Sequence, residues 1–278
     1  MPELPEVETI VRACGPQLAG RQICGFRALW PRSVSPTVAA VRRGVVGQTI
    51  EALTRRGKYI VFHLTRGWML VHLRMSGRLE LADGQQTLPP HTSAEWRLDD
   101  GRRLLLCDTR KFGRIIYTRR LESVTADLGP EPLAPDFTWT VLRHRLGGKR
   151  RQIKTLLLDQ SVVAGLGNIY ADESLFRAGL HPRRKSDELS EGEIRRLHRA
   201  IRCVLRLAIR YGGTSFDAAY LGGRMQERLM VYGRDGRPCR RCGAPITFLR
   251  VGQRGTHVCP RCQPPADARA VSVAELDS

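Results

Sequence analysis

The first six residues of the chain combine an uncommon nucleophile with two carboxylates. Met1 is followed by Pro2, Glu3 and, one helical turn later, Glu6. If Met1 is removed, Pro2 carries a free secondary amine, and an α-amino group with a pKa of about 7.7–8 is partly neutral at physiological pH. Such an amine can form a Schiff base with an electrophilic carbon, and Glu3 could pass protons beside it. The alternative is that Pro2 and Pro5 only begin a helix, because proline is favoured in the first helical turn.

Four cysteines near the end of the chain have the spacing of a metal site. Two residues separate Cys239 from Cys242 and Cys259 from Cys262, and sixteen residues lie between the pairs. This spacing is typical of a four-cysteine zinc site, in which four thiolates leave no open coordination position. We therefore expect one structural Zn²⁺ that holds a hairpin. The remaining cysteines are scattered among apolar residues and are predicted to be buried; they are Cys14, Cys24, Cys107 and Cys203.

The charge balance indicates a polyanionic partner. The 278 residues include 46 Lys and Arg against 27 Asp and Glu, which gives a formal net charge of +19. Only five of the basic residues are lysines, and the planar guanidinium of arginine suits phosphate. Nucleic acid is the simplest partner; the alternative is a basic surface that only confers solubility. No apolar run is long enough to span a membrane, and no secretory signal is recognisable, so we expect a cytoplasmic location without membrane contact.

Several segments place cations beside glycine or aromatic residues. Lys58 ends the run Arg55-Arg56-Gly57-Lys58, which could grip a phosphate. Met75 lies in a polar turn, and Phe112 is flanked by Arg110 and Lys111, an arrangement that can stack on a base while arginine holds a base edge or the backbone. The alternatives are a solvated turn for Lys58 and core packing for Met75 and Phe112.

A further phosphate site is predicted around Asn168. Gly165 and Gly167 precede it and permit tight backbone turns, and Asn168 is predicted to cap the helix that follows. The free N–H groups at such a helix start bind phosphate, although an ordinary helical hairpin is the alternative. Arg254 falls at the predicted tip of the zinc hairpin, where it could enter a groove or contact a phosphate.

Hydrophobic periodicity predicts the elements that must position these residues. Residues 1–19 form one helix, whose positive end favours the carboxylate of Glu6. Between residues 22 and 116, short β-rich runs separated by Gly and Asp turns predict an antiparallel sandwich or barrel. Helices are expected at 140–144, from 153 to about 159, through 171–176 and at 191–211.

These elements predict an α+β multidomain fold. The predicted parts are a β-rich region at 1–130, a helical region at 131–225, a zinc hairpin at 226–264 and a disordered tail at 265–278; the family resemblance given below implies that the first is a catalytic β-sandwich and the second a DNA-binding domain.

The order of the motifs resembles that of the Fpg/Nei family of base-excision repair enzymes, and in particular its formamidopyrimidine-DNA glycosylase branch. The shared segments, within residues 1–263, are MPELPEVET, RRGK, HLRMSGRL, DTRKFGR, LGPEPL, LLLDQSVVAGLGNIYADESLF, VYGR and RGTHVCPRCQ. The resemblance implies a β-sandwich followed by a helix-two-turn-helix domain and a zinc finger, with damaged double-stranded DNA as partner. We expect the enzyme to act as a monomer.

The resemblance also implies roles for individual residues. Pro2 would attack C1′ of the damaged nucleotide, with Glu3 as general acid and base and Glu6 in the same catalytic group. Lys58 would contact phosphate and assist β-elimination, and Arg254 would contact the phosphates of the lesion and take part in δ-elimination. DNA contacts are implied for His72, Met75, His91, Arg110, Phe112, Lys149 and Asn168. Met75, Arg110 and Phe112 would fill the space left by the flipped base.

The implied activity is that of a bifunctional DNA glycosylase and abasic-site lyase for oxidised purines, 8-oxoguanine and formamidopyrimidines. It would form a Schiff base on Pro2 and cleave the strand by β,δ-elimination. Residues 215–230 form a shorter loop than the lesion-capping loop of this family, so a Nei-like preference for oxidised pyrimidines or abasic sites is the alternative. A more remote alternative is a non-catalytic zinc-finger protein that binds DNA damage, although such a protein has no use for Pro2.

Overall fold

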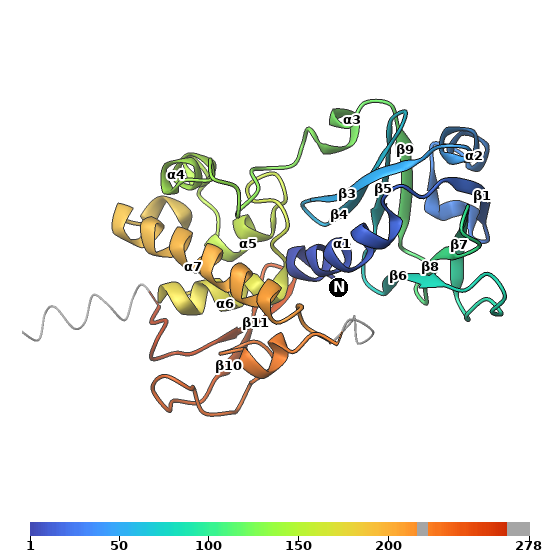
Figure 1. Ribbon diagram of the computed structural model, residues 1–278. Coiled ribbons are helices and arrows are strands. Elements are labelled where there is room, and N and C mark those ends of the chain that lie inside the picture. The colour runs from blue at the N-terminus through green and yellow to red at the C-terminus, as the bar shows by residue number, and fades with distance from the viewer. Residues whose placement is uncertain (216–221, 266–278) are drawn as a thin grey trace, which may run out of the picture. The chain divides into compact units, whose positions relative to one another are not determined.

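The chain folds into two compact units. The computed structural model (Figure 1) describes residues 1–215 and 222–265. The N-terminal unit comprises Met1–Asp127 together with Ile209–Gln226, and the C-terminal unit comprises Leu128–Ala208 together with Glu227–Ser278. The break after residue 127 lies close to the predicted boundary at 130, whereas the segment after Ala208 groups with the N-terminal unit. Residues 216–221, near the start of the predicted lesion-capping loop, and the tail from 266 onward lie outside the described residues.

Two sheets form the body of the N-terminal unit. One is four-stranded, in the order β1-β7-β8-β6, and the other is five-stranded, in the order β2-β9-β5-β4-β3. All neighbouring strands are antiparallel except β2 and β9, which are parallel. The strands are β1 (Ile23–Ala28), β2 (Val34–Ser35), β3 (Ile50–Arg56), β4 (Tyr59–Leu64), β5 (Trp68–His72), β6 (Gly77–Ala82), β7 (Thr92–Leu98), β8 (Arg103–Asp108) and β9 (Arg114–Thr118). The sequence-predicted antiparallel sandwich is thereby confirmed.

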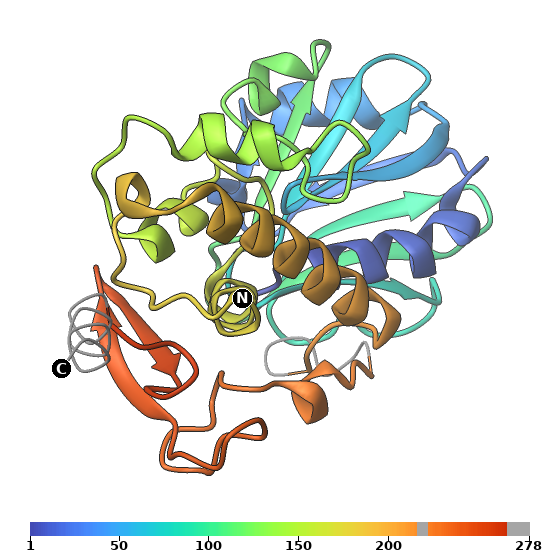
Figure 2. The same cartoon turned by 90° about the vertical axis from the view of Figure 1, so that its left-hand side faces the viewer.

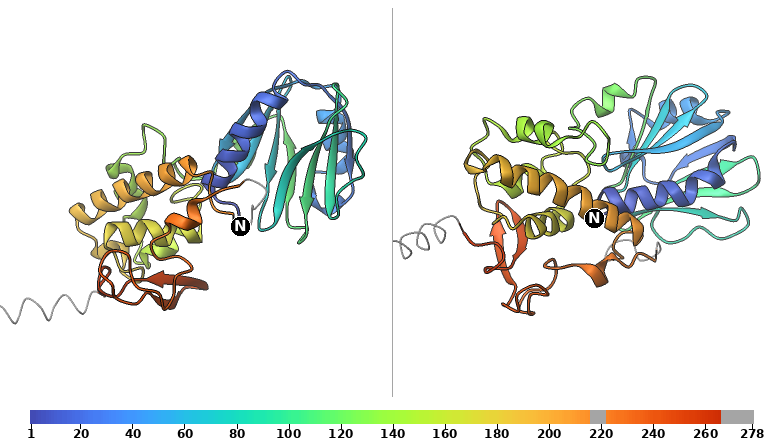
Figure 3. Two further views of the ribbon diagram at one scale, coloured as in Figure 1. Left: turned by 60° about the horizontal axis from the view of Figure 1, so that its bottom comes forward. Right: turned by 60° about the vertical axis from the view of Figure 1, so that its left-hand side comes forward.

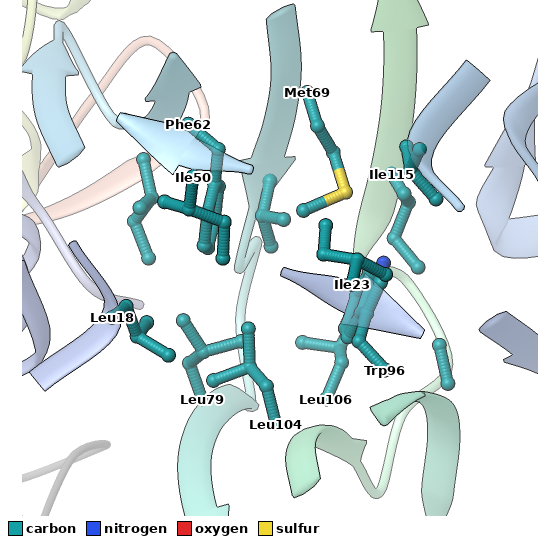
Figure 4. Close-up of a cluster of buried hydrophobic side chains, with 14 of the residues drawn as sticks. Leu18, Ile23, Ile50, Phe62, Met69, Leu79, Trp96, Leu104, Leu106 and Ile115 are labelled. Atoms are coloured by element: carbon teal, nitrogen blue, oxygen red, sulfur yellow. The ribbon is translucent and has the colours of Figure 1, made fainter. Parts of the chain in front are cut away.

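The core of this unit lies between the two sheets, which face each other in the left panel of Figure 3. Alternation along each strand sends one set of side chains inward. Figure 4 shows Phe62 and Met69 from the five-stranded sheet pointing toward Trp96 and Leu106 from the four-stranded sheet. All four side chains are fully buried, so the sandwich supplies a rigid base for the loops at its ends.

Helix α1 (Leu4–Leu18) lies along β3 in the N-terminal unit. Its apolar residues recur at helical spacing, and Leu4, Val7, Ile10 and Leu18 are almost fully buried. Because this apolar stripe is fixed against the unit, the start of the helix is fixed as well. The unit also contains α2 (Val38–Val45), α3 (Glu122–Thr125) and a 3₁₀ turn at Pro31–Ser33. A second 3₁₀ turn, Met225–Arg228, begins in this unit and ends in the C-terminal unit.

The C-terminal unit combines helices with a two-stranded hairpin. Its helices are α4 (Trp139–Leu146), α5 (Ile153–Leu158), α6 (Asn168–Ala178) and α7 (Glu191–Arg210), with a 3₁₀ turn at Ser186–Glu188. Helices α5 and α6 pack on each other, and α6 also packs on the hairpin. Figure 2 shows that hairpin, β10 (Thr247–Val251) and β11 (Arg254–Val258), in red. The helices predicted from periodicity are all present within a few residues of their expected bounds.

The structure bears on two expectations from composition, the burial of the scattered cysteines and the absence of a membrane-spanning segment. Of the four scattered cysteines, Cys107 is buried as predicted, Cys14 and Cys203 are half-buried, and Cys24 is exposed. The prediction is wrong for Cys24 because the alternation of side chains along β1 places it on the outer face. Among the helices that the structure describes, none is both long and apolar enough to cross a membrane.

Candidate active site and metal centre

The start of α1 buries two carboxylates side by side. Glu3 and Glu6 are each 2% exposed. They form a reciprocal capping pair, in which the N–H of Glu3 donates to Oε2 of Glu6 at 2.9 Å, as expected where an acidic residue satisfies free N–H groups at a helix start. The other oxygen of Glu6 accepts hydrogen bonds from the N–H of Thr214 at 2.7 Å and from its hydroxyl at 3.2 Å. Glu6 therefore ties the helix start to the segment that follows α7.

The amino terminus lies in a partly buried, highly charged environment. Burial lowers the pKa of the Met1 α-amino group below its usual range, and the cations Lys58 and Arg110 act in the same direction, whereas Glu3 and Glu6 oppose the shift. Lys58 is only 7% exposed, so the alternative of a solvated turn does not hold for it. The structure thus brings the chain start, both carboxylates, Lys58 and Arg110 within electrostatic range of one another.

Gly213 is the residue that allows Glu6 to reach Thr214. Its φ is +75°, and an added Cβ would lie 2.7 Å from Oε1 and 2.9 Å from Cγ of Glu6. We expect Gly213→Ala to lower the free energy of unfolding by about 3 kcal/mol, since the left-handed backbone alone costs an alanine about 1–2 kcal/mol and the clash adds to it. Activity should fall as well, because Glu6 must move.

Gly212 provides the matched control for this prediction. Its φ is +71°, but an added Cβ would meet its nearest neighbour, Cα of Gly223, only at 3.5 Å. Gly212→Ala therefore carries the backbone cost without the clash. Urea unfolding of both variants measures the difference; equal stabilities would show that contact with Glu6 contributes nothing.

His72 is held as a neutral imidazole. It ends β5 and is 9% exposed. Burial lowers the pKa of His72 to about 3, with further lowering from Arg74 and Lys58. The N–H of Arg74 donates to Nδ1 at 3.0 Å, so the ring proton lies on Nε2. The Nε2–H group of this uncharged ring can therefore donate a hydrogen bond. Tyr59 packs edge-on against the ring, with centroids 4.8 Å apart.

This histidine makes stability depend on pH in a defined direction. Below its ordinary pKa of about 6.5 the unfolded chain binds a proton at His72 that the folded protein does not bind until about pH 3, so stability falls as pH decreases through this window, by up to about 1.4 kcal/mol per pH unit. We expect His72→Gln to remove this contribution. Urea unfolding of both proteins at about pH 7 and about pH 4.5 measures it; parallel losses of stability in the two proteins would contradict the prediction.

Two large apolar side chains are presented to solvent beside cations. Met75 is 37% exposed and Phe112 is 48% exposed, so neither fills the core. The guanidinium of Arg110 lies 5.2 Å from the centroid of the Phe112 ring, which holds the two side chains together. His91, also exposed, precedes β7 and adopts a positive φ of 63°. Exposed apolar groups flanked by cations are what base stacking requires.

In the C-terminal unit, a buried lysine holds the tip of the zinc hairpin. Lys154 is fully buried and pairs with Asp172 at 2.6 Å. Its Nζ also donates to the carbonyl of Gly255 at 3.0 Å, and Nδ2 of Asn168 donates to the same carbonyl at 2.9 Å. Arg254 precedes this anchored residue and is exposed. Asn168 and Lys154 therefore both bond the residue next to Arg254, and this fixes the backbone at the hairpin tip.

Two predictions in this unit need correction or qualification. Asn168 does not cap α6: Gly167 occupies the N-cap position, and the amide of Asn168 is directed to Gly255 instead, because the hairpin offers it a buried acceptor. Lys149 lies in the connection between α4 and α5, where its carbonyl accepts a hydrogen bond from Ser186. Among the described contacts, none joins the Lys149 side chain to Asn168 or Arg254.

The four clustered cysteines form a metal site as predicted. The Sγ atoms of Cys239, Cys242, Cys259 and Cys262 all lie within 4.8 Å of one another. Sγ of Cys242 is 3.4 Å from Sγ of Cys259, and Sγ of Cys239 is 4.0 Å from Sγ of Cys262. A tetrahedral zinc ion with Zn–S bonds of about 2.3 Å requires sulfur atoms about 3.8 Å apart. The residues therefore fit one structural zinc ion, whose four thiolate ligands leave no position for substrate.

Sequence reasoning overlooked several residues that organise the site. Thr214, Lys154 and Asp108 were assigned no role, although each is buried and holds a predicted site residue or its loop. A lysine inside the apolar run of α5 was the available signal for Lys154. Thr214 gave no such signal, because its partner Glu6 is 208 residues away.

Comparison with known proteins gives consistent matches along the chain. Three family models match: the formamidopyrimidine-DNA glycosylase N-terminal domain at residues 1–115, the formamidopyrimidine-DNA glycosylase H2TH domain at 128–219, and the zinc finger found in FPG and IleRS at 236–265.

Relatives and solved structures cover nearly the whole chain. The formamidopyrimidine-DNA glycosylase of Geobacillus kaustophilus is 45% identical over 275 residues, which is 95% of this chain and all of the relative. That of Symbiobacterium thermophilum is 44% identical and covers 98% of this chain and 92% of the relative. The Lactococcus lactis Fpg in complex with abasic-site DNA has a TM-score of 0.89 at 37% identity, over 95% of this chain and all of that chain. A complex of the wild-type L. lactis Fpg with DNA containing N7-benzyl-Fapy-dG has a TM-score of 0.90 over the same shares.

Proposed function

This chain belongs to the formamidopyrimidine-DNA glycosylase family, and we propose that it excises oxidised purines from duplex DNA and then cleaves the strand. The substrates would be 8-oxoguanine and formamidopyrimidines. The observation that carries the proposal is the buried, charged environment around the chain start, because an amine with a lowered pKa is a nucleophile at neutral pH. The relatives are named for this glycosylase activity, and the similar solved structures of the Lactococcus lactis Fpg contain abasic or Fapy-dG DNA.

The proposed nucleophile is the secondary amine of Pro2 after removal of Met1. The same burial and the same cation, Lys58, would then act on the Pro2 nitrogen. Attack at C1′ forms a C–N bond and displaces the damaged base, which needs a proton; Glu3 is the proposed general acid and base. The Pro2 nitrogen then loses its proton, the C1′–O4′ bond of the sugar ring breaks, and O4′ takes a proton from Glu3, which leaves an iminium between Pro2 and C1′. This iminium acidifies the C2′ proton, so loss of this proton with departure of the 3′ phosphate gives β-elimination. Loss of the 5′ phosphate completes δ-elimination, with Arg254 on the phosphates.

DNA contacts are proposed for two groups of residues. In the N-terminal unit, exposed Met75 and Phe112 with Arg110 would occupy the space left by the flipped nucleotide, offsetting the few kcal/mol that flipping costs. His72, as a neutral donor, and His91 would contact the strand. In the C-terminal unit, Asn168 and Lys149 would bind phosphates. The net charge of +19 supports a nucleic-acid partner.

Borohydride trapping tests the proposal. The protein is incubated with a duplex carrying one 8-oxoguanine opposite cytosine, reduced, and digested, and the modified peptide is identified by mass spectrometry. We expect a covalent adduct on Pro2. An adduct only with abasic DNA would keep the lyase and remove 8-oxoguanine as the main substrate, and no adduct with either would refute the Schiff-base mechanism.

The length of the segment 215–230 motivates one alternative, a preference for oxidised pyrimidines. A shorter loop leaves less protein to cover a flipped purine. Single-turnover excision from matched duplexes that carry 8-oxoguanine or thymine glycol separates the two; equal or faster release of thymine glycol would favour the alternative.

A further inference from the structure

Asp108 joins three segments of the N-terminal unit that carry proposed DNA contacts. Its side chain is buried, with 1% exposed. Oδ1 accepts hydrogen bonds from the hydroxyl of Ser76 at 2.5 Å and from the N–H of Arg110 at 3.1 Å, and Oδ2 accepts one from the N–H of Gly113 at 2.7 Å. The N–H of Asp108 donates to the carbonyl of His91 at 2.9 Å. One residue thus contacts the segments of Met75, His91 and Phe112.

Ser76 bridges the two loops that present the exposed apolar side chains. Its hydroxyl donates to Asp108 and at the same time accepts the N–H of Arg110 at 3.1 Å. Met75 is adjacent to Ser76, and Phe112 is adjacent to Gly113. Each of the two apolar side chains is therefore one residue away from a group bonded directly to Asp108.

Packing alone does not hold these loops in place. A cavity of about 250 Å³ adjoins them, lined in part by Ser76, His91 and Asp108. Two non-glycine residues in the loops adopt left-handed backbone, Arg74 with φ 57° and Lys111 with φ 58°. Such conformations persist only where the surroundings determine them. The N–H of Lys111 donates to the backbone carbonyl of Asp108 at 3.2 Å, whereas the N–H of Arg74 donates to His72. Because space is available beside the loops, these bonds and those of the Asp108 side chain hold them where packing does not.

We propose that Asp108, acting with Ser76, is a positioning residue that holds the Met75 loop and the Arg110–Phe112 loop as one unit for insertion into duplex DNA. This inference rests on the proposed function. Inserted side chains are needed only where a stacked, paired nucleotide must leave the helix. Loss of the coupling should therefore slow excision from a duplex and leave cleavage of a single-stranded abasic site unchanged.

Asp108→Asn tests the coupling with little change in volume. The amide has one acceptor oxygen where the carboxylate has two, so its NH₂ group must face a backbone N–H in either orientation. In one it faces Gly113; in the other it faces Arg110 and the hydroxyl of Ser76 loses its acceptor. We expect single-turnover release of 8-oxoguanine from a duplex to fall by ~10–100-fold, the effect of losing hydrogen bonds to a charged group. Fluorescence of 2-aminopurine placed beside the lesion should show slower or less complete flipping.

Ser76→Ala is the milder variant and leaves the carboxylate in place. This variant removes one of the three hydrogen bonds to the Asp108 side chain and leaves its two N–H donors, so we expect a smaller, ~3–10-fold decrease on the duplex. Ser76→Thr, which keeps the hydroxyl, should restore the rate. Ser123→Ala is the matched control, because among the described residues that exposed hydroxyl of the same unit bonds only to Thr118 and Arg120 in its own turn.

The two substrates separate the possible outcomes. Losses confined to the duplex, with restoration by threonine, support the proposal. Equal losses on duplex and single strand in both Asp108→Asn and Ser76→Ala would overturn the proposal, because the defect would then lie in folding or chemistry. Unchanged duplex rates in both variants would overturn it as well. If the wild-type protein fails to cleave even the abasic strand, the proposed function itself fails.

Discussion

Replacement of Pro2 by glycine is expected to slow release of the damaged base by on the order of 10³-fold or more, the scale seen when a covalent nucleophile is lost. A secondary amine gives an iminium with a fixed positive charge, whereas a primary amine gives an imine that must also be protonated. Glycine further frees the backbone just before α1, which begins at Leu4. The geometry that Glu3 and Glu6 impose on the chain start would then be less strictly defined.

The measurement is single-turnover base release together with borohydride trapping, and Pro5→Ala is the control. Pro5 lies in the first turn of the same helix but cannot provide the terminal amine, so this variant should retain activity. Residual trapping of Pro2→Gly on a preformed abasic site is compatible with the mechanism, because its terminal amine remains. Wild-type rates of base release, with the adduct mapped to Lys58, would assign the nucleophile to the lysine instead.

Removal of zinc is expected to weaken DNA binding by ~100-fold or more. The apolar cluster around the site contains only five buried residues, two of which are the ligands Cys239 and Cys259. A structural zinc site supplies about 10–16 kcal/mol of apparent binding free energy in isolated fingers, so this small cluster cannot replace it. Without the metal, the hairpin that carries Arg254 should unfold while the sandwich of the N-terminal unit remains folded.

Chelation and Cys259→Ser test this expectation in parallel. Fluorescence anisotropy reports DNA binding, a colorimetric chelator reports zinc release, and thermal unfolding followed by tryptophan fluorescence reports the rest of the protein. Cys203→Ser, which alters a cysteine of α7 outside the cluster, should behave as wild type. Undiminished DNA binding after stoichiometric zinc release would show that the hairpin folds without metal or takes no part in binding.

Much of the site could be predicted because its signals are local. The zinc ligands are two pairs of cysteines whose spacing alone determines that they can converge, and their Sγ atoms do so. The helix start at Pro2–Glu6 and the alternating strands of the sandwich follow from short-range preferences as well. Roles for the DNA-contact residues came instead from resemblance to a family, and they stay predictions.

What only the tertiary structure decided is the pairing of polar groups far apart in the chain. Glu6 with Thr214, Lys154 with Gly255, and Ser76 with Asp108 are separated by 208, 101 and 32 residues. A chain offers many donors and acceptors, and packing selects among them because a buried polar group must find a partner. For the same reason the side chain of Asn168 donates to the carbonyl of Gly255 and does not cap α6 as predicted. It also set the low pKa of His72, since burial and nearby cations exist only in the folded protein.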